Sequence, residues 1–243
     1  MVSNGEGAGE DSPTAIRRAL ARVIGAEVQA TLGPKARAAA VYGSVAHGRA
    51  RRHSDLELVV LTTDDVPPEE EQFVCHGIVV ELDRLPAARM LAAASRVTTL
   101  WGVEADQYRH HWILWDPDGI FSQVRAKAVS IPDAAYRQAL DASRYRLREL
   151  WGKFLNATEA GEPDTAVDVA WRFAHAAAMR LALRQRRPFE SGRTLWREAR
   201  ERSACMGQLL DALTGGRQAV IRDVLQRILA TEEDAQGGTG RCE

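Results

Sequence analysis

The sequence VYGSVAHGRARRHSDLELVV, residues 41–60, contains the features that predict the fold of this chain. A β-branched and aromatic lead-in ends at Gly43-Ser44, and an apolar run at 58–61 follows the acidic residues Asp55 and Glu57. Residues two apart in a strand point to the same side. A strand over 55–62 therefore presents both carboxylates on one face.

Two carboxylates side by side at the start of a strand repel each other unless a hard divalent cation lies between them. Mg²⁺ prefers one or two protein carboxylates, with phosphates and water completing its shell. The turn at Gly43 and Ser44 offers backbone N–H groups and a hydroxyl to a phosphate. The segment thus predicts a metal site at Asp55 and Glu57 beside a phosphate site. The alternative is a surface turn followed by a strand with a solvated acidic face.

Composition limits the classes of protein to which the chain belongs. Its 243 residues fit one large or two modest domains, and its net charge of −1 gives no global basic field for nucleic acid. The three cysteines are scattered without a C-x-x-C pair, which is typical of a reducing cytoplasm rather than a disulfide framework. No apolar run is long enough for a membrane span. We therefore expect a cytoplasmic protein without a nucleic-acid or membrane partner.

The first half of the chain mixes helix and strand patterns. Residues 1–11 are acidic and glycine-rich, which predicts a disordered leader. Ser12-Pro13 is a favourable start for a helix that runs up to Gly33. His76-Gly77 predicts a hairpin turn, and the acidic, proline-broken stretch 63–72 predicts a loop. The other predicted elements are strands at 36–42, 55–62, 73–75, 78–83 and 111–115, and helices at 44–50 and 87–94.

The second half of the chain consists of helical patterns only. The predicted helices lie at 120–129, 133–157, 164–186, 192–213 (with a possible break near Ser203) and 216–231. We predict an α+β fold in which a small mixed β-sheet flanked by helices, residues 12–128, precedes an all-helical domain, residues 129–236. Residues 237–243 are expected to form a loose tail.

The Gly43-Ser44 pair, with Asp55-x-Glu57 beginning eleven residues after the serine, resembles the signature of the DNA polymerase β-type nucleotidyltransferase superfamily. The resemblance implies that residues 12–128 form a nucleotidyltransferase domain using Mg²⁺ and a nucleoside triphosphate. Such chemistry usually needs a third carboxylate. Glu81 is the best candidate because it lies on a neighbouring strand, and Asp83 is the fallback. The alternative for Glu81 is an exposed sheet edge.

A second motif lies on the predicted helix 133–157. Glu149 and Lys153 are four residues apart on the side opposite the apolar stripe, and this pattern alone favours a solvent-exposed salt pair. However, RELWGKFLN at 148–156 resembles the E-x-x-G-K-x-x-N helix of the kanamycin nucleotidyltransferase-like aminoglycoside 4′-O-nucleotidyltransferases. The resemblance implies that Glu149 is the general base that binds the acceptor sugar, and that Lys153 contacts nucleotide phosphate.

The likeness to this family extends from about residue 38 to about residue 200. It places Glu81 at a metal-binding or substrate-binding position, and Trp101 matches a tryptophan of the family. It further implies that the partners are ATP or another nucleoside triphosphate and an aminoglycoside. The chain is then expected to form a homodimer with shared active sites, the base-bearing helix coming from the partner subunit. The nucleotide-binding residues that it implies are Gly43, Ser44, Thr99, Lys153 and Ser191.

The sequence departs from the family at several positions. His47 stands where the family has an arginine near the phosphates. Tyr145 and Arg146 replace two acidic residues that help to hold the cationic antibiotic, for which anionic partners are expected. Glu104, Asp106, Asp141 and the acidic loop are the candidates to compensate. From their patterns, His110, His111 and His175 are interpreted as packing or surface histidines.

These features lead to one functional hypothesis and its alternatives. The chain is expected to transfer AMP, or another nucleoside monophosphate, from the Mg²⁺-bound triphosphate to an aminoglycoside hydroxyl, at the 4′ position, which would give antibiotic resistance. One alternative keeps the chemistry and changes the acceptor to a lincosamide, a tRNA end or a protein hydroxyl. Another is a catalytically silent nucleotide-binding module.

Overall fold

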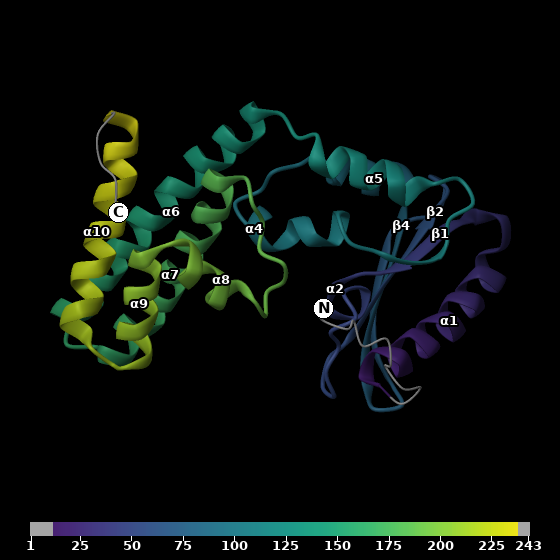
Figure 1. The fold of residues 1–243 in the computed structure, drawn as a ribbon, viewed down its shortest axis with the longest axis horizontal. Helices are drawn as coiled ribbons and strands as arrows, with labels where there is room; N and C mark the ends of the chain where they lie inside the picture. Colours follow the sequence, from purple (N-terminus) through teal and green to yellow (C-terminus); the bar gives the residue numbers. More distant parts are fainter. Residues whose placement is uncertain (1–11, 238–243) are drawn as a thin grey trace, which may run out of the picture. The chain divides into compact units, whose positions relative to one another are not determined.

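The computed structural model of the chain describes residues 12–237, with side chains from 12 to 231. The predicted leader, 1–11, and residues 238–243 of the predicted tail lie outside this range. By their internal contacts the described residues form two compact units, traced in Figure 1. The first contains the chain up to Arg96 together with Ala105–Ile131. The second contains Val97–Glu104 and the chain from Pro132 onward.

The first unit is built around a five-stranded sheet in the order β3-β4-β2-β1-β5. The strands β2 and β4 run parallel, whereas β1 is antiparallel to β2 and β5, and β3 is antiparallel to β4. The sheet is therefore mixed, as predicted. The strands are β1 (Ala36–Val41), β2 (Leu56–Thr62), β3 (Glu69–Cys75), β4 (Ile78–Pro86) and β5 (Trp112–Trp115).

Helices cover both faces of this sheet (Figure 1). On one face, Leu56, Leu58 and Val60 pack in the core that includes α1 (Pro13–Leu32). On the other face, Val59 and Leu61 pack against apolar residues of the helices at 87–93 and 120–129. This alternation follows from the two-residue period of a strand. The remaining elements of the unit are α2 (Gly43–Ala46), α3 (Ala87–Ala93), α5 (Ile120–Val129) and the 3₁₀ turns η1 (Gly33–Lys35) and η2 (Ala105–Tyr108).

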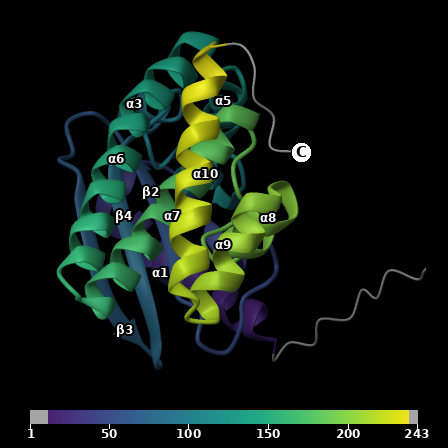
Figure 2. The ribbon, with the colours of Figure 1, turned by 90° about the vertical axis from the view of Figure 1, so that its left-hand side faces the viewer.

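The described residues of the second unit form helices joined by turns and short loops, without a strand among them. Its core is rich in alanine along α7, with Phe173, Leu209 and Leu225 fully buried, so that the helices approach closely. In Figure 2, α10 runs alongside α6, α7 and α9, with which it makes contacts. The helices are α4 (Trp101–Glu104), α6 (Asp133–Glu159), α7 (Pro163–Gln185), α8 (Leu195–Arg202), α9 (Ala204–Thr214) and α10 (Gln218–Gly237).

The observed elements confirm the predicted α+β fold class and most predicted segments. The expected break at Ser203 is present, because this residue is extended (φ −151°, ψ 120°) and its hydroxyl accepts a hydrogen bond from the N–H of Met206 at 3.3 Å. A serine that ends one helix and caps the next satisfies N–H groups at the new helix start. The hairpin turn at His76-Gly77 is also confirmed by the pairing of β3 with β4.

Two predicted segments were wrong. The predicted helix 44–50 is only the single turn α2, which ends at Ala46 before the glycine turn. The predicted loop 63–72 contains the start of β3 at Glu69, because Arg84 on the neighbouring strand pairs with Glu69 and Glu71 at 2.9 and 2.7 Å. Charged residues on the outermost strand also discourage pairing with another chain.

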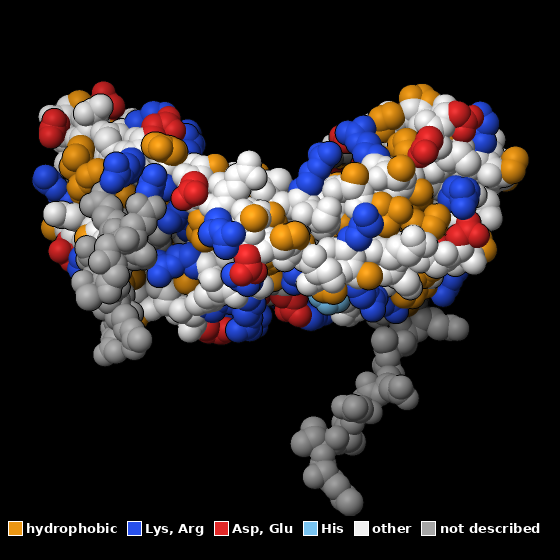
Figure 3. Space-filling model, turned by 90° about the horizontal axis from the view of Figure 1, so that it is seen from above, with side chains coloured by type: hydrophobic (Ala, Val, Ile, Leu, Met, Phe, Trp, Pro, Cys, Tyr) orange, Lys and Arg blue, Asp and Glu red, His pale blue; other side chains and the backbone are white. Residues whose placement is uncertain are grey.

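Surface charge is mixed on the face drawn in Figure 3, where basic and acidic side chains alternate with apolar and neutral ones. This distribution agrees with the net charge of −1. None of the described helices combines the length and the apolar character that crossing a lipid bilayer requires.

Candidate functional site

The predicted acidic residues of the first unit form a row on one face of its sheet. Glu57 on β2 and Glu81 on β4 are directly paired residues of the parallel ladder, and Asp83 is paired with Val59 two positions further along. Asp55 immediately precedes β2 and is two residues before Glu57. We refer to Asp55, Glu57 and Glu81 as the carboxylate row.

Glu81 does not lie on a sheet edge. Its strand β4 lies between β3 and β2, so the edge-strand alternative for this residue is wrong. The carboxylate of Glu81 accepts a hydrogen bond from Gln72 Nε2 on β3 at 3.1 Å. The parallel pairing of β2 with β4 is what brings this glutamate beside Glu57, across 24 residues of sequence.

The carboxylate row concentrates negative charge in a partly buried place. Burial, followed by the charges of Asp55, Glu81 and Asp106, raises the pKa of Glu57 to about 7, against a smaller opposing effect of a hydrogen bond from the Ser44 backbone. Burial and the charges of Asp55 and Asp83 also raise the pKa of Glu81. Neighbouring carboxylates that disfavour one another's ionisation are stabilised by a bound cation.

The Gly43-Ser44 turn lies against this row. Gly43 has φ +64°, and a Cβ built on it would lie 1.6 Å from Oε2 of Glu57. Glycine is therefore required here for both backbone conformation and space. The Ser44 hydroxyl is buried without a hydrogen-bond partner among the described residues. An unsatisfied buried hydroxyl beside carboxylates fits a place where a phosphate or a hydrated cation binds. The donor set therefore fits Mg²⁺ bound to a nucleotide.

A buried arginine supports the loop that carries Asp55. Arg17 on α1 is 3% exposed, and its guanidinium donates to the carbonyl oxygen of Ser54 through Nε at 2.8 Å and to that of Arg52 at 2.9 Å. It also donates to the carbonyl oxygen of Pro13 at 3.0 Å. Since these bonds fix the backbone directly before Asp55, Arg17 positions that carboxylate without belonging to the row.

A cavity of about 300 Å³ continues along the same side of the sheet. Val59 and Asp83, each two residues beyond a member of the carboxylate row, line it, and the Tyr42 hydroxyl donates to Asp83 at 3.0 Å. Arg89 and Tyr108 contribute a cation and an aromatic ring to its wall. Its volume lies at the lower end of the range of small-molecule pockets. Sequence reasoning missed this cavity because its walls come from distant segments.

The predicted base and its lysine lie on α6, in the second unit. Lys153 Nζ is 2.6 Å from Glu149 Oε1, and Arg146 NH1 is 2.9 Å from Oε2 of the same glutamate. Hydrogen bonds from these two cations lower the pKa of Glu149. All three side chains are about half exposed. The geometry is the solvent-exposed salt pair that the spacing alone favours, and the catalytic role of Glu149 stays a prediction.

The two remaining predicted nucleotide contacts also belong to the second unit. Thr99 is exposed in the turn before α4. Ser191 lies before α8, where its hydroxyl accepts from the N–H of Thr194 at 3.3 Å and its own N–H donates to Thr194 Oγ1 at 3.1 Å. These bonds give Ser191 a local structural role in the turn that leads into α8. Binding of nucleotide by Thr99 and Ser191 stays a prediction.

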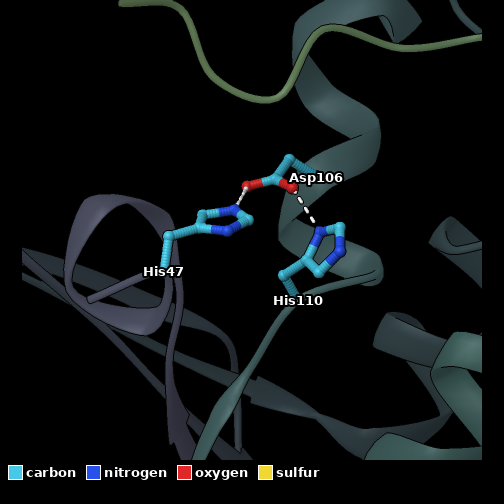
Figure 4. Close-up of side chains that lie close together, drawn as sticks. All are labelled: His47, Asp106 and His110. Carbon is cyan, nitrogen blue, oxygen red and sulfur yellow. Dashed lines mark hydrogen bonds and ion pairs between the residues drawn. The ribbon is translucent and has the colours of Figure 1, made fainter. Parts of the chain in front are cut away.

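One cluster was not foreseen from the sequence. His47, Asp106 and His110 come together in the first unit, with Asp106 between the two imidazoles (Figure 4). His110 was expected to be a packing or surface residue, and Asp106 entered only as a possible compensating acid. The four-residue spacing of Asp106 and His110 was the available signal. The position of His47 depends on the fold and could not be read from spacing.

Comparison with known proteins shows a shared fold. No protein-family model and no curated protein matches this sequence. The crystal structure of a nucleotidyltransferase-like protein from Exiguobacterium sibiricum 255-15 is similar to this chain, with a TM-score of 0.54 and 16% sequence identity. The match covers 91% of this chain and 77% of that one. At this identity the likeness shows that the fold is shared.

Proposed function

We propose that this chain is a Mg²⁺-dependent nucleotidyltransferase that moves AMP from ATP to a hydroxyl of an aminoglycoside in the cytoplasm, and so inactivates the antibiotic. The proposal rests above all on the carboxylate row lying against the Gly43-Ser44 turn. The fold shared with a nucleotidyltransferase-like protein supports the same chemistry.

In this proposal the first unit binds the nucleotide. The N–H groups and hydroxyl of the Gly43-Ser44 turn receive phosphate oxygens, and Asp55, Glu57 and Glu81 hold the metal. Mg²⁺, when bound, would neutralise charge on the triphosphate and on the leaving pyrophosphate. The Ser44 hydroxyl, which has no hydrogen-bond partner among the described residues, and the mutual repulsion of the carboxylates favour this assignment.

The transfer itself would be a displacement at phosphorus. The acceptor oxygen bonds to the α-phosphorus, the bond from that atom to the bridging oxygen breaks, and pyrophosphate leaves. Glu149 would take the proton of the acceptor hydroxyl as a general base. Lys153 would contact phosphate, as the family resemblance implies.

A direct test is to incubate the protein with ATP and Mg²⁺ and a panel of aminoglycosides and lincosamides, and to measure pyrophosphate release. Release that depends on an aminoglycoside, together with a product heavier by one AMP, is expected. Pyrophosphate release with lincosamides alone would contradict an aminoglycoside acceptor. ATP binding without any pyrophosphate release would favour the catalytically silent nucleotide-binding module.

The proposed homodimer can be tested by complementation. If Glu149 acts in the active site of the partner subunit, Asp55→Asn and Glu149→Gln variants are each inactive, but their mixture regains activity. A mixed dimer would contain one site with both residues intact, so up to about a quarter of wild-type activity is expected from random pairing. A mixture as inactive as its components would contradict shared sites. Glu159→Gln, an exposed change on the same helix, is the control for each single variant.

A second acceptor class is favoured by one observation. Arg146 bonds to Glu149, which places a positive charge beside the proposed base where the family has an acid. A positive charge repels a polycationic aminoglycoside more than a lincosamide, which carries fewer amines. Arg146→Glu should therefore raise kcat/KM for aminoglycosides and leave that for lincosamides little changed.

A further inference from the structure

His47, Asp106 and His110 form a cluster outside the carboxylate row. The carboxylate of Asp106 bonds both imidazoles, with Oδ2 2.9 Å from His47 Nε2 and Oδ1 2.5 Å from His110 Nδ1. Figure 4 shows the two rings pointing at this carboxylate from different segments. Two imidazole nitrogens therefore lie close to the two oxygens of one carboxylate.

The backbone holds these three side chains in position. Asp106 belongs to η2, and its carbonyl oxygen accepts from the N–H of His110 at 3.0 Å, which fixes the four-residue offset between them. His47 ends the short helix α2, and its N–H donates to the carbonyl oxygen of Gly43 at 3.3 Å. Arg109 further ties the segment to α5 through the carbonyl oxygen of Ala128 at 3.1 Å. The donors are thus pre-arranged.

Burial differs across the cluster in a way that suits an ion. The Asp106 side chain is 9% exposed and that of His47 is 11% exposed, whereas that of His110 is 55% exposed. A buried carboxylate is costly unless it has cationic or hydrogen-bonding partners. The exposed side at His110 gives a path for an ion and leaves room for water in a fourth position, as three-ligand zinc sites require.

The spacing of the donors is compatible with tetrahedral coordination. The three ligand atoms lie within 4.8 Å of one another. Bonds of about 2.0–2.2 Å to a tetrahedral ion separate its ligands by about 3.3 Å. The hydrogen-bonded distances of 2.9 and 2.5 Å are shorter than this, and the limit of 4.8 Å is longer, so binding one ion needs side-chain shifts of up to about 1.5 Å.

We propose that His47, Asp106 and His110 bind a transition-metal dication of the Zn²⁺ class. Imidazole with one carboxylate suits Zn²⁺, Co²⁺ or Ni²⁺, whereas the all-oxygen carboxylate row suits Mg²⁺. The ion ties the Gly43–Ala46 turn to the segment that carries Asp106 and His110. This site is separate from the proposed catalytic metal, and its occupation requires neither ATP nor an acceptor.

The first test is calorimetric titration with Zn²⁺ on the metal-free protein in the presence of Mg²⁺. One ion per chain is expected, with a rise in Tm because the ion binds the folded state. His110→Gln, at the exposed position, should weaken binding by roughly tenfold to a hundredfold or more. His76→Asn removes a surface imidazole on the β3–β4 turn and should leave binding unchanged.

A second measurement identifies the ligands. Co²⁺ at this site should give the visible absorption of a four-coordinate ion without the charge-transfer band that thiolate ligands produce, which separates it from binding at the free cysteines. The spectrum should persist in Asp55→Asn and be lost in His110→Gln and Asp106→Asn. Zn²⁺ binding that survives in His110→Gln but is lost in Asp55→Asn would place the ion in the carboxylate row and overturn the proposal. Equal binding by wild type and His110→Gln would overturn it as well.

Discussion

Two glutamates, one in each unit, show how differently this chain treats a carboxylate away from solvent. Glu198 on α8 is 9% exposed and is surrounded by donors: Thr194 Oγ1 at 2.6 Å, the N–H of Glu190 at 3.0 Å, and the guanidinium of Arg202. Burial acts to raise the pKa of Glu198, but these donors outweigh it and lower that pKa. Glu57, in contrast, faces other carboxylates, and its pKa rises to about 7.

This contrast indicates a different role for each glutamate. A buried carboxylate that serves structure is given an arginine and hydrogen bonds by the chain itself, as at Glu198. Within the carboxylate row, Glu57 accepts a backbone hydrogen bond from Ser44 and Glu81 accepts one from Gln72, but neither carboxylate has, among the described residues, an ion pair like that of Glu198 with Arg202, and both lie beside further acids. A cation from solution would stabilise such a group. Removing the carboxylate of Glu57 should therefore lower activity without lowering stability. Removing that of Glu198 should lower stability.

The largest expected effect is that of Glu57→Gln on activity. The amide is a poorer metal ligand, so nucleotidyl transfer should fall by about a thousandfold or more, measured as pyrophosphate release. Since the change also removes a repelled charge, the Tm in metal-free buffer should stay the same or rise. Glu71→Gln on β3 is the control, because Glu71 lies outside the row. Activity of Glu57→Gln within tenfold of wild type would contradict the assignment.

Glu198→Gln, in contrast, is expected to act on stability. Removing this carboxylate leaves Arg202, 6% exposed, without its counter-charge, so the free energy of unfolding should fall by about 3 kcal/mol. Urea unfolding followed by circular dichroism measures the loss. Glu201→Gln on the same helix, where the side chain is 64% exposed and 4.0 Å from Arg197, should change it by under about 0.5 kcal/mol. Equal losses of unfolding free energy in Glu198→Gln and Glu201→Gln would show that burial does not determine how much each carboxylate stabilises the fold.

The pH dependence of stability should also show the contribution of Glu198. Because the pKa of Glu198 is lower in the folded chain than its ordinary 4.5, its stabilisation is complete above that value. The stabilisation is lost as pH falls from about 4.5 through the folded pKa. The gap in unfolding free energy between wild type and Glu198→Gln should therefore narrow in this window. A gap that stays constant down to pH 2 would contradict the lowered pKa.

Arg17→Met is expected to lower stability by no more than Glu198→Gln does. The change leaves the carbonyl oxygens of Arg52 and Ser54 without their guanidinium donor, which should cost about 1–3 kcal/mol and weaken Mg²⁺ binding through a displaced Asp55. Arg22→Met on the same helix is the control, since Arg22 lies over the Trp112 ring at 5.0 Å and is exposed. That control should lose under about 1 kcal/mol and keep its affinity for Mg²⁺. Unchanged Mg²⁺ affinity in Arg17→Met would contradict the role of Arg17 in positioning Asp55.

Much of the fold could be predicted because local patterns determine it. The glycine turn, the acid–x–acid strand and the capping serine at Ser203 each carry their structural cause in a few neighbouring residues. The start of β3 could not be predicted in this way. Its run of glutamates has the composition of a loop, and only the cross-strand contacts of Arg84 with Glu69 and Glu71 make a strand of it.

For the candidate site, spacing predicted that Asp55 and Glu57 share a face, and Glu81 followed from the neighbouring strand. The parallel register that places Glu81 beside Glu57, the support from Arg17 and the meeting of His47 with Asp106 depend on contacts between distant segments. For the exposed pair of Glu149 and Lys153, no contact between distant segments is needed. Spacing alone predicted its geometry, whereas its proposed role comes from the family resemblance.

We propose above that the carboxylate row binds a divalent cation together with nucleotide. Mn²⁺, which accepts the same oxygen ligands as Mg²⁺ and is visible by electron paramagnetic resonance, tests it directly. With ATP present, wild type and Glu71→Gln should bind Mn²⁺ tightly, and Glu57→Gln should bind it at least tenfold more weakly. Equal Mn²⁺ affinity in wild type and Glu57→Gln would contradict the claim.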